Sequence, residues 1–348
     1  MGWKKCGGTA GALISAAGLL ALLAVMLLWW RGSSYGFAGR TAAILSAALF
    51  AAGALRSVPG WMRFWSREME PELCFPDEPP HMLPRLFAAG LALDALFLLL
   101  VHLLRRLSGA DTGFFEGLEF WTCLDSGHYL DIARDWYLSE GEWDRLVQLV
   151  FLPGYPLLIR LFMCLTGDAL SAGLLAAALC FAAALCVLYR LLRLDAPHAQ
   201  AMRTLRYLCI LPGAFFFAAP MSESLFLLLT AACLFCARTG RWTRGCLLGG
   251  CAAFTRSLGL TLLVPLLFEL ISTAAKGAQP RGRVCVHFAA LLLVPAGFGV
   301  YLLVNCRVSG NPFQFLIYQS EHWGQRTGWF FNTAAYQTEY AISCLGTN

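Results

Sequence analysis

The polar stretch from residue 105 to 150 brings an acidic, an imidazole and a phenol side chain close together in sequence. Asp125, His128 and Tyr129 fall in a segment whose apolar residues recur at helical spacing, which predicts a short amphipathic helix. Asp125 and His128 are three residues apart, so they share a helix face and are able to bind a divalent ion or relay a proton. The spacing supplies no third ligand, so no metal is predicted. Judged alone, Asp125 is better explained as a helix cap that accepts from backbone N–H groups.

A single arginine, Arg256, interrupts the apolar stretch from Gly245 to Phe268. A charge in such a position is costly unless it is paired or faces an aqueous cavity. A guanidinium forms bidentate hydrogen bonds to phosphate oxygens, so we favour a phosphate or pyrophosphate ligand. The alternative is a structural ion pair with Glu223 or Asp94, and the two interpretations are compatible if they hold in different states.

Two further polar groups have simple structural explanations. Ser222 and Glu223 lie at the turn between two apolar segments, where a serine cap followed by an acid in the first turn is expected of any helix. Gln319, His322 and Trp323 crowd together near the end of the chain, and by themselves they indicate a solvated loop. Both groups become candidates for ligand binding only if the fold brings them to Asp125 and Arg256.

The composition decides what kind of elements position these residues. Only 14% of the 348 residues are charged, against about 25% in ordinary globular proteins, and 58% are hydrophobic. The mean hydropathy is +0.62. The net charge of +5 comes from short basic clusters between apolar blocks, which determine membrane topology and do not form a nucleic-acid footprint. These numbers predict an all-α polytopic membrane protein.

Apolar runs and the residues that break them predict about nine transmembrane helices. They lie near residues 10–30, 40–55, 85–104, 169–190, 204–220, 222–237, 245–257, 258–273 and 285–305. A further run from Val150 to Leu165 begins with prolines and carries Arg160, so we interpret it as an interfacial or re-entrant helix. No Gly-rich nucleotide loop is present.

The positions of the basic clusters predict the orientation, because arginine and lysine accumulate on the inner side of a membrane. Placing Lys4 and Lys5 inside also puts the clusters near residues 56–85, 190–206, 238–244 and 276–283 inside. The same assignment sends the stretch 105–150, the turn at Ser222, Arg256 and the tail from residue 306 to the extracytoplasmic face. Polar groups gathered at one membrane surface are what a site requires.

Several motifs occur in an order that resembles a known enzyme family. They are Asp125-Ser126-Gly127-His128-Tyr129 with Ile132-Ala133, Phe151-Leu152-Pro153-Gly154-Tyr155-Pro156-Leu157, Leu211-Pro212-Gly213-Ala214-Phe215-Phe216 leading to Ala219-Pro220-Met221-Ser222-Glu223-Ser224, Thr255-Arg256-Ser257-Leu258-Gly259, and Asn311-Pro312-Phe313 with His322-Trp323. This order resembles the glycosylphosphatidylinositol mannosyltransferase II (PIG-V-like) family of GT-C membrane glycosyltransferases, bacterial type. The resemblance covers roughly residues 85 to 330.

The resemblance implies a GT-C-like bundle with a large extracytoplasmic first core loop that contains interfacial helices. It also implies an inverting transfer of a hexose, mannose above all, from a polyprenyl-phosphate donor to a lipid or cell-surface glycan hydroxyl. Asp125 would be the catalytic base. The substrate would be bound by His128, Tyr129, Ser222, Glu223, Arg256, Gln319, His322 and Trp323. No cofactor and no nucleic-acid partner are expected, and the enzyme would reside in a bacterial plasma membrane or a eukaryotic endoplasmic-reticulum membrane.

The sequence departs from the family pattern at two positions of the first motif region. Leu124 stands where a tryptophan is expected, and Trp136 stands where a glycine is expected. Family members continue into further spans after the His-Trp loop, whereas this chain ends at Asn348, so the resemblance makes it a fragment or a short form. We expect residues 1–84 to form a two-span extension with an inner loop, and residues 85–348 to form the glycosyltransferase domain.

Two other classes of protein remain open. A lipid-linked substrate transporter or flippase would use Arg256 and Asp94 in an alternating-access path and would show an internal repeat of spans, which we do not find. A non-catalytic membrane assembly protein would tolerate the loss of Asp125.

Overall fold

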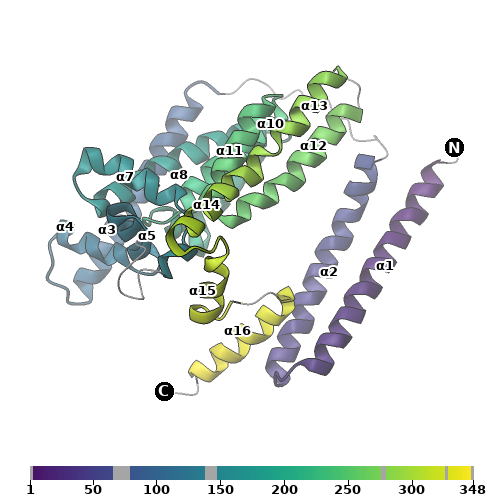
Figure 1. Ribbon diagram of the computed structural model, residues 1–348, viewed down its shortest axis with the longest axis horizontal. Helices are drawn as coiled ribbons and strands as arrows, with labels where there is room; N and C mark the ends of the chain where they lie inside the picture. The colour runs from purple at the N-terminus through teal and green to yellow at the C-terminus, as the bar shows by residue number, and fades with distance from the viewer. Residues whose placement is uncertain (1–2, 66–78, 138–146, 276–279, 326–327, 346–348) are drawn as a thin grey trace. The chain divides into compact units, whose positions relative to one another are not determined.

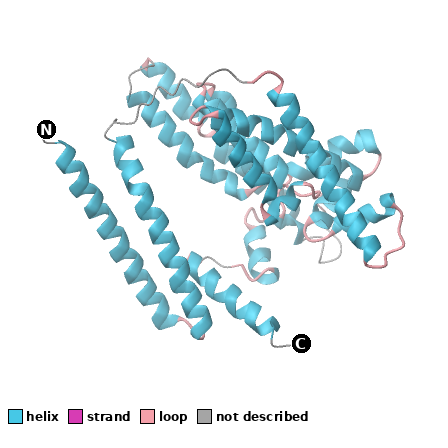
Figure 2. Ribbon diagram, turned by 180° about the vertical axis from the view of Figure 1, so that it is seen from behind, coloured by secondary structure: helices cyan, strands magenta, loops and turns pink. Residues whose placement is uncertain are grey.

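The computed structural model describes residues 3–65, 79–137, 147–275, 280–325 and 328–345, and these residues form helices with no strand among them (Figure 2). Six of the helical segments are long and apolar enough to cross a membrane. They are Gly11–Gly32, Phe37–Gly60, Met82–Leu107, Ala169–Arg193, Ser257–Ala274 and Gly282–Ser309. The chain is therefore an all-α polytopic membrane protein, as its composition predicts.

Each of the six segments coincides with a predicted span, and the other three predicted spans correspond to shorter helices. These are α9 (His198–Ile210) followed by η3 (Pro212–Phe217), α10 (Glu223–Arg238) and α11 (Trp242–Thr255). The segment 204–220 is broken because Pro212 disfavours helical geometry at the preceding residue, and Leu211 accordingly has φ −60° and ψ 143°. The count of nine spans stays a prediction.

The chain divides into two compact units, residues 1–72 with 325–348, and residues 73–324. The predicted boundary at residue 84 rests on the resemblance and stays a prediction. In the first unit, α1 (Trp3–Gly32) and α2 (Phe37–Trp65) form a hairpin, and α16 (Phe330–Leu345) packs against α2. The Trp29 indole N–H donates to Asn332 Oδ1 at 2.9 Å, and Phe331 is fully buried between the helices.

The second unit is a helix bundle in which α8 (Ala169–Arg193) is central (Figure 1). It packs against α3 (Met82–Leu107), α7 (Gly154–Thr166) and α10, and α11 extends the bundle from α10 to α14 (Leu293–Ser309). The backbones of α11 and α14 touch where two glycines face each other. A Cβ atom on Gly297 would lie 1.9 Å from the Gly250 carbonyl oxygen, so no larger residue fits.

The remaining helices of this unit are short or complete a span. They are α4 (Phe114–Gly117), η1 (Leu118–Thr122), α5 (Ser126–Asp135), η2 (Val147–Val150), η4 (Ser257–Leu262), α12 (Leu263–Ala275), α13 (Arg281–Ala290) and α15 (Gln314–His322).

Helix α7 corresponds to the run that we interpreted as interfacial or re-entrant. Its 13 residues extend about 20 Å, which is short of a bilayer core of about 30 Å. Its Arg160 side chain points to α5 and not to lipid, because Nε donates to the Ala133 carbonyl and Nη2 donates to the Arg134 carbonyl, both at 2.9 Å. The charge thus fastens α7 to the end of α5.

Helix ends that were predicted to share the inner face lie together in the second unit. Arg238, at the end of α10, donates to both carboxylate oxygens of Asp195, at 2.8 and 2.7 Å, and its Nε lies 3.7 Å from Glu269 of α12. This contact supports the relative placement of the loops. The direction of the bundle with respect to the membrane stays a prediction.

Candidate functional site

The first helix of the candidate site is α5, which begins directly after Asp125. Leu124, the residue before Asp125, has a positive φ of 54°, a conformation that is uncommon for a residue with a side chain. Asp125 has helical dihedrals (φ −75°, ψ −9°) and its carboxylate forms no capping hydrogen bond. The cap interpretation of Asp125 is therefore wrong in this structure. Asp125 is exposed, and its carboxylate does not accept a hydrogen bond from the backbone of α5.

Tyr129 connects α5 to the start of α10. Its hydroxyl lies 3.0 Å from Ser222 Oγ, and its ring is buried. Burial raises the pKa of Tyr129 to about 12, although the hydrogen bond to Ser222 and the charge of Arg256 act in the opposite direction, while the charges of Glu223 and Asp125 add to the rise. Tyr129 therefore keeps its proton at neutral pH. The same interactions place Asp125, Glu223 and Arg256 within electrostatic range of one hydroxyl.

Arg256 lies between α11 and η4, in extended backbone with φ −148° and ψ 138°. Its Nη1 donates to Ser222 Oγ at 2.9 Å and forms a short ion pair with the Glu223 carboxylate. The predicted structural partner Glu223 is thus present. The other predicted partner, Asp94, is not used: both of its carboxylate oxygens are buried without a hydrogen bond in the described part of the chain.

The arginine is held by only one of its nitrogens. The Arg256 side chain is 34% exposed, and its Nη2 and Nε form no hydrogen bond with the described residues. One edge of the planar group therefore stays available to an anion. Ser222 is likewise not the helix cap that its position suggests, because its hydroxyl contacts Tyr129 and Arg256 and makes no cap bond.

Glu223 opens α10 with its carboxylate 29% exposed. One of its oxygens, Oε1, pairs with Arg256, whereas Oε2 is buried and has no hydrogen-bond partner among the described side chains and backbone. A buried acceptor without a partner is unusual in native proteins. Glu223 therefore combines the role of counter-ion with one unused acceptor next to the exposed edge of Arg256.

An aromatic contact brings the tail to α5. His128 stacks on Phe151 with ring centroids 4.7 Å apart, and Trp323 meets the same phenylalanine edge to face at 6.0 Å. Tyr129 also contacts Phe151, at 5.3 Å. Phe151 thus joins three predicted site residues, although it is not itself among the predicted substrate-binding residues. Its position directly before the Leu152-Pro153-Gly154 turn was the available signal.

The other tail residues are less closely connected. His322 lies 4.0 Å from Glu321 and its ring centroid is 5.8 Å from that of Tyr318. The Gln319 carbonyl accepts from the Trp323 amide, but its side chain forms no hydrogen bond to the cluster within the described chain. The structure therefore brings Asp125, Tyr129, Ser222, Glu223 and Arg256 together, with His128 and Trp323 beside them, and it leaves Gln319 apart.

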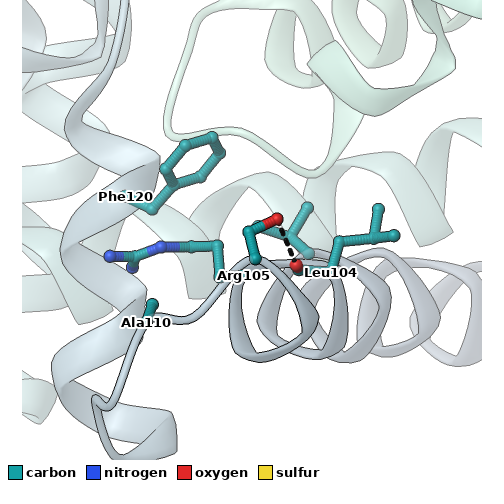
Figure 3. A pocket seen from close by; sticks show the side chains of 6 residues that line it. Leu104, Arg105, Ala110 and Phe120 are labelled. Carbon is teal, nitrogen blue, oxygen red and sulfur yellow. Dashed lines mark hydrogen bonds between the residues drawn. The ribbon is translucent and has the colours of Figure 1, made fainter.

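Among the described residues, no three His, Cys, Asp or Glu side chains lie close enough to share one ion. A cavity of about 260 Å³ lies at the end of α3. Figure 3 shows Arg105 extending beside Phe120 at its edge; the guanidinium lies 5.4 Å from that ring and donates to the Gly117 carbonyl at 3.1 Å. Arg105 thus fastens the loop to α3.

The fold and the site define the class as an all-α polytopic membrane protein with a charged cluster, Asp125, Tyr129, Ser222, Glu223 and Arg256, at adjoining helix ends of its larger unit. No family model, no curated protein and no solved structure matches the chain.

Proposed function

We propose that this protein is a membrane glycosyltransferase that moves a hexose, mannose by resemblance, from a polyprenyl-phosphate donor to a hydroxyl of a lipid or cell-surface glycan on the extracytoplasmic face. The observation that carries the proposal is the cluster around Arg256. Residues from three separate motifs meet at Tyr129: its hydroxyl contacts Ser222, Arg256 binds both Ser222 and Glu223, and the charges of Asp125, Glu223 and Arg256 act on the Tyr129 hydroxyl.

The chemistry of such a transfer needs two groups that the cluster supplies. Asp125 is exposed and free of the helix, so it is able to accept a proton from an acceptor hydroxyl. Arg256 offers an unused guanidinium edge to the donor phosphate. A nucleotide is not required, because the sugar is already activated by its phosphate.

In the proposed step, Asp125 takes the proton of the acceptor hydroxyl while the hydroxyl oxygen forms a bond to the anomeric carbon. The bond from that carbon to the phosphate oxygen breaks, and its electron pair leaves with the polyprenyl phosphate. Arg256 stabilises the added negative charge on the phosphate. Because the acceptor enters opposite the leaving group, the anomeric configuration inverts.

The backbone at Trp136 gives independent support to the resemblance. This residue stands where the family has glycine, and it ends α5 with φ 66° and ψ −170°, a region that is adopted almost only by glycine. The chain thus keeps the glycine-like turn although the side chain has changed. Arg160 covers the Trp136 ring at 5.8 Å and helps to hold the turn.

The test is a transfer assay with the purified full chain. Polyprenyl-phosphate mannose and a lipid-acceptor extract are supplied in detergent, and mass spectrometry follows a gain of one hexose on an acceptor lipid. We expect this product with the wild-type protein and little of it with Asp125→Asn. A wild-type protein that releases no polyprenyl phosphate and modifies no lipid, while other hexose donors also fail, would rule out the transfer.

Asp94 favours a second candidate function, transport of a lipid-linked substrate. A carboxylate buried in a membrane span without a hydrogen-bond partner in the described chain is a common feature of proton-coupled carriers. Reconstitution in vesicles separates the two functions. A transporter moves the intact lipid-linked sugar between leaflets, whereas a transferase leaves free polyprenyl phosphate behind.

A further inference from the structure

An open apolar groove runs between α1 and α2 in the smaller unit, which carries none of the proposed site residues. It has a volume of about 380 Å³. One wall consists of leucines of α1 and the other of an isoleucine and alanines of α2, including Leu19, Leu23, Leu27, Ile44, Ala48 and Ala51. Leu23 and Leu27 are 56% and 57% exposed, so the described helices of the smaller unit leave the groove uncovered on this side.

The groove has the length of one membrane leaflet. It extends along α1 from Leu19 to Trp30, about 16 Å at the rise of an α-helix, and half of a bilayer core is about 15 Å. Trp30 lies at its end, and tryptophan prefers the level of the lipid headgroups. An acyl chain from the adjacent leaflet therefore matches the groove in both chemistry and length.

A cation lies at the tryptophan end. The Arg40 guanidinium sits 4.8 Å from the centre of the Trp30 ring, and its Nη2 donates to the Ser33 carbonyl at 3.1 Å. In the described part of the chain Arg40 forms no ion pair. The Glu339 carboxylate is also at this end, but it accepts from the Gly36 amide.

Two polar atoms at this end lack partners. Arg40 Nε and Ser33 Oγ are both buried and make no hydrogen bond with the described residues. Each is able to donate, and an unsatisfied buried donor is costly. A phosphate accepts several hydrogen bonds, and its negative charge would pair with Arg40, which forms no ion pair among the described residues.

We propose that this groove binds an anionic phospholipid, with one acyl chain between α1 and α2 and the phosphate at Arg40 and Ser33. A second protein helix is a poorer occupant. Membrane helices associate closely through small residues on both partners, whereas the α1 wall carries long leucines. An apolar helix would also offer no acceptor to Arg40 Nε or Ser33 Oγ.

The test is native mass spectrometry of the full chain, released from detergent after addition of phosphatidylglycerol or of diacylglycerol with the same chains. The two lipids differ in the phosphoglycerol headgroup. We expect the wild type to hold phosphatidylglycerol about tenfold more strongly, as a charged hydrogen bond predicts. Arg40→Gln should lower that binding to the level of diacylglycerol, and Ala51→Phe should lower the binding of both lipids by filling the groove.

Arg31→Gln is the matched control, because Arg31 is an exposed arginine at the same hairpin end, whereas the Arg40 guanidinium lies over the Trp30 ring. It should bind phosphatidylglycerol like the wild type. Equal losses in Arg31→Gln and Arg40→Gln would overturn the proposal in favour of diffuse charge attraction. The proposal would also be overturned if Ala51→Phe bound phosphatidylglycerol like the wild type. It would equally be overturned if the wild type formed a dimer and no lipid adduct, and this dimer disappeared in Ala51→Phe. Unchanged helical circular dichroism is required of each variant, and if Ala51→Phe fails to fold, the two arginine variants decide.

Discussion

Helices α5 and α8 both begin after an aspartate, yet the two carboxylates behave differently. Asp168, before α8, has extended dihedrals of φ −135° and ψ 154°, and its side chain accepts from the Ser171 amide at 2.8 Å. Asp125, before α5, has helical dihedrals and caps nothing. The first carboxylate stabilises its helix. The second is left free at the end of a polar cluster, and only the second is suited to chemistry.

The difference teaches that a helix-start aspartate must be judged by its backbone. A capping side chain needs a non-helical cap residue, so that its oxygen faces the first free N–H groups. The positive φ of Leu124 turns the chain just before Asp125 and carries that residue into helical geometry. The carboxylate thereby loses its role in the helix.

The largest expected effect is a difference in transfer rate between variants of Asp125 and Asp168. Asp125→Asn keeps the size of the side chain but removes its ability to take a proton, so we expect transfer to fall by about 10² to 10⁴. Asp168→Asn is the matched control and should transfer sugar at the wild-type rate, because asparagine caps a helix as well as aspartate does. Rates are measured at equal protein amounts after a check of thermal stability. Transfer by Asp125→Asn within threefold of the wild type would remove Asp125 from the mechanism and leave Glu223 as the candidate base.

A smaller effect is expected at Arg256, the cation of the cluster, which contacts Ser222 and Glu223. Arg256→Lys keeps the charge but loses the planar fork that reaches Ser222, Glu223 and a phosphate together. We expect at least a tenfold weaker use of the donor, measured as the half-saturating donor concentration, with acceptor use unchanged. Arg105→Lys is the control, since Arg105 binds only its own loop and Phe120. Wild-type donor use by both Arg256→Lys and Arg256→Met would leave Arg256 with its ion-pair role alone.

Tyr129 offers a prediction about pH. Because its pKa is raised to about 12, it stays protonated throughout the range in which the protein is assayed. Tyr129→Phe should therefore lower the transfer rate by less than tenfold, the value of one neutral hydrogen bond, and leave the shape of the pH–rate profile unchanged. If the rise or fall of the transfer rate between pH 6 and 10 disappeared in Tyr129→Phe, the prediction that Tyr129 stays protonated would be contradicted.

The smallest effect concerns stability. Asp168→Ala should destabilise the protein by about 1 kcal/mol, seen as a lower midpoint of thermal unfolding in detergent, because α8 loses its cap. Although partial burial acts to raise the pKa of Asp168, hydrogen bonds from Ser171 and Leu170 and the charge of Arg134 lower it below its ordinary value of 3.8. The stabilisation is therefore present above pH 3.8 and is lost as the pH falls through the lowered pKa. Asp125→Ala should show no such loss, and an equal loss in both variants would contradict the comparison.

The sequence predicted the long spans well, because hydropathy over about twenty residues does not depend on neighbours. It also identified the polar turn at Ser222 and Glu223 and the interruption of an apolar stretch by Arg256. It could not tell whether Arg256 would pair with Glu223 or with Asp94, since that depends on how α3, α10 and α11 are rotated against one another. The apolar pattern predicted residues 204–220 as one span, although the chain breaks at Leu211-Pro212 into α9 and η3.

The position of Phe151 was also beyond the sequence. Its contacts to His128, Tyr129 and Trp323 join residues that are far apart in the chain, and no spacing rule predicts them. The sequence also did not predict the local backbone geometry. An aspartate at a helix start usually caps the helix, but the positive φ of Leu124 prevents this at Asp125.

The contact between Gly250 and Gly297 has a consequence for Arg256. Since the backbones of α11 and α14 touch there, no side-chain layer separates the two helices, and α11 ends five residues further on at Thr255, directly before Arg256. The backbone that leads into Arg256 is therefore packed directly against α14. In the transferase that we propose, the donor phosphate would therefore meet an arginine whose backbone follows directly on a tightly packed helix pair.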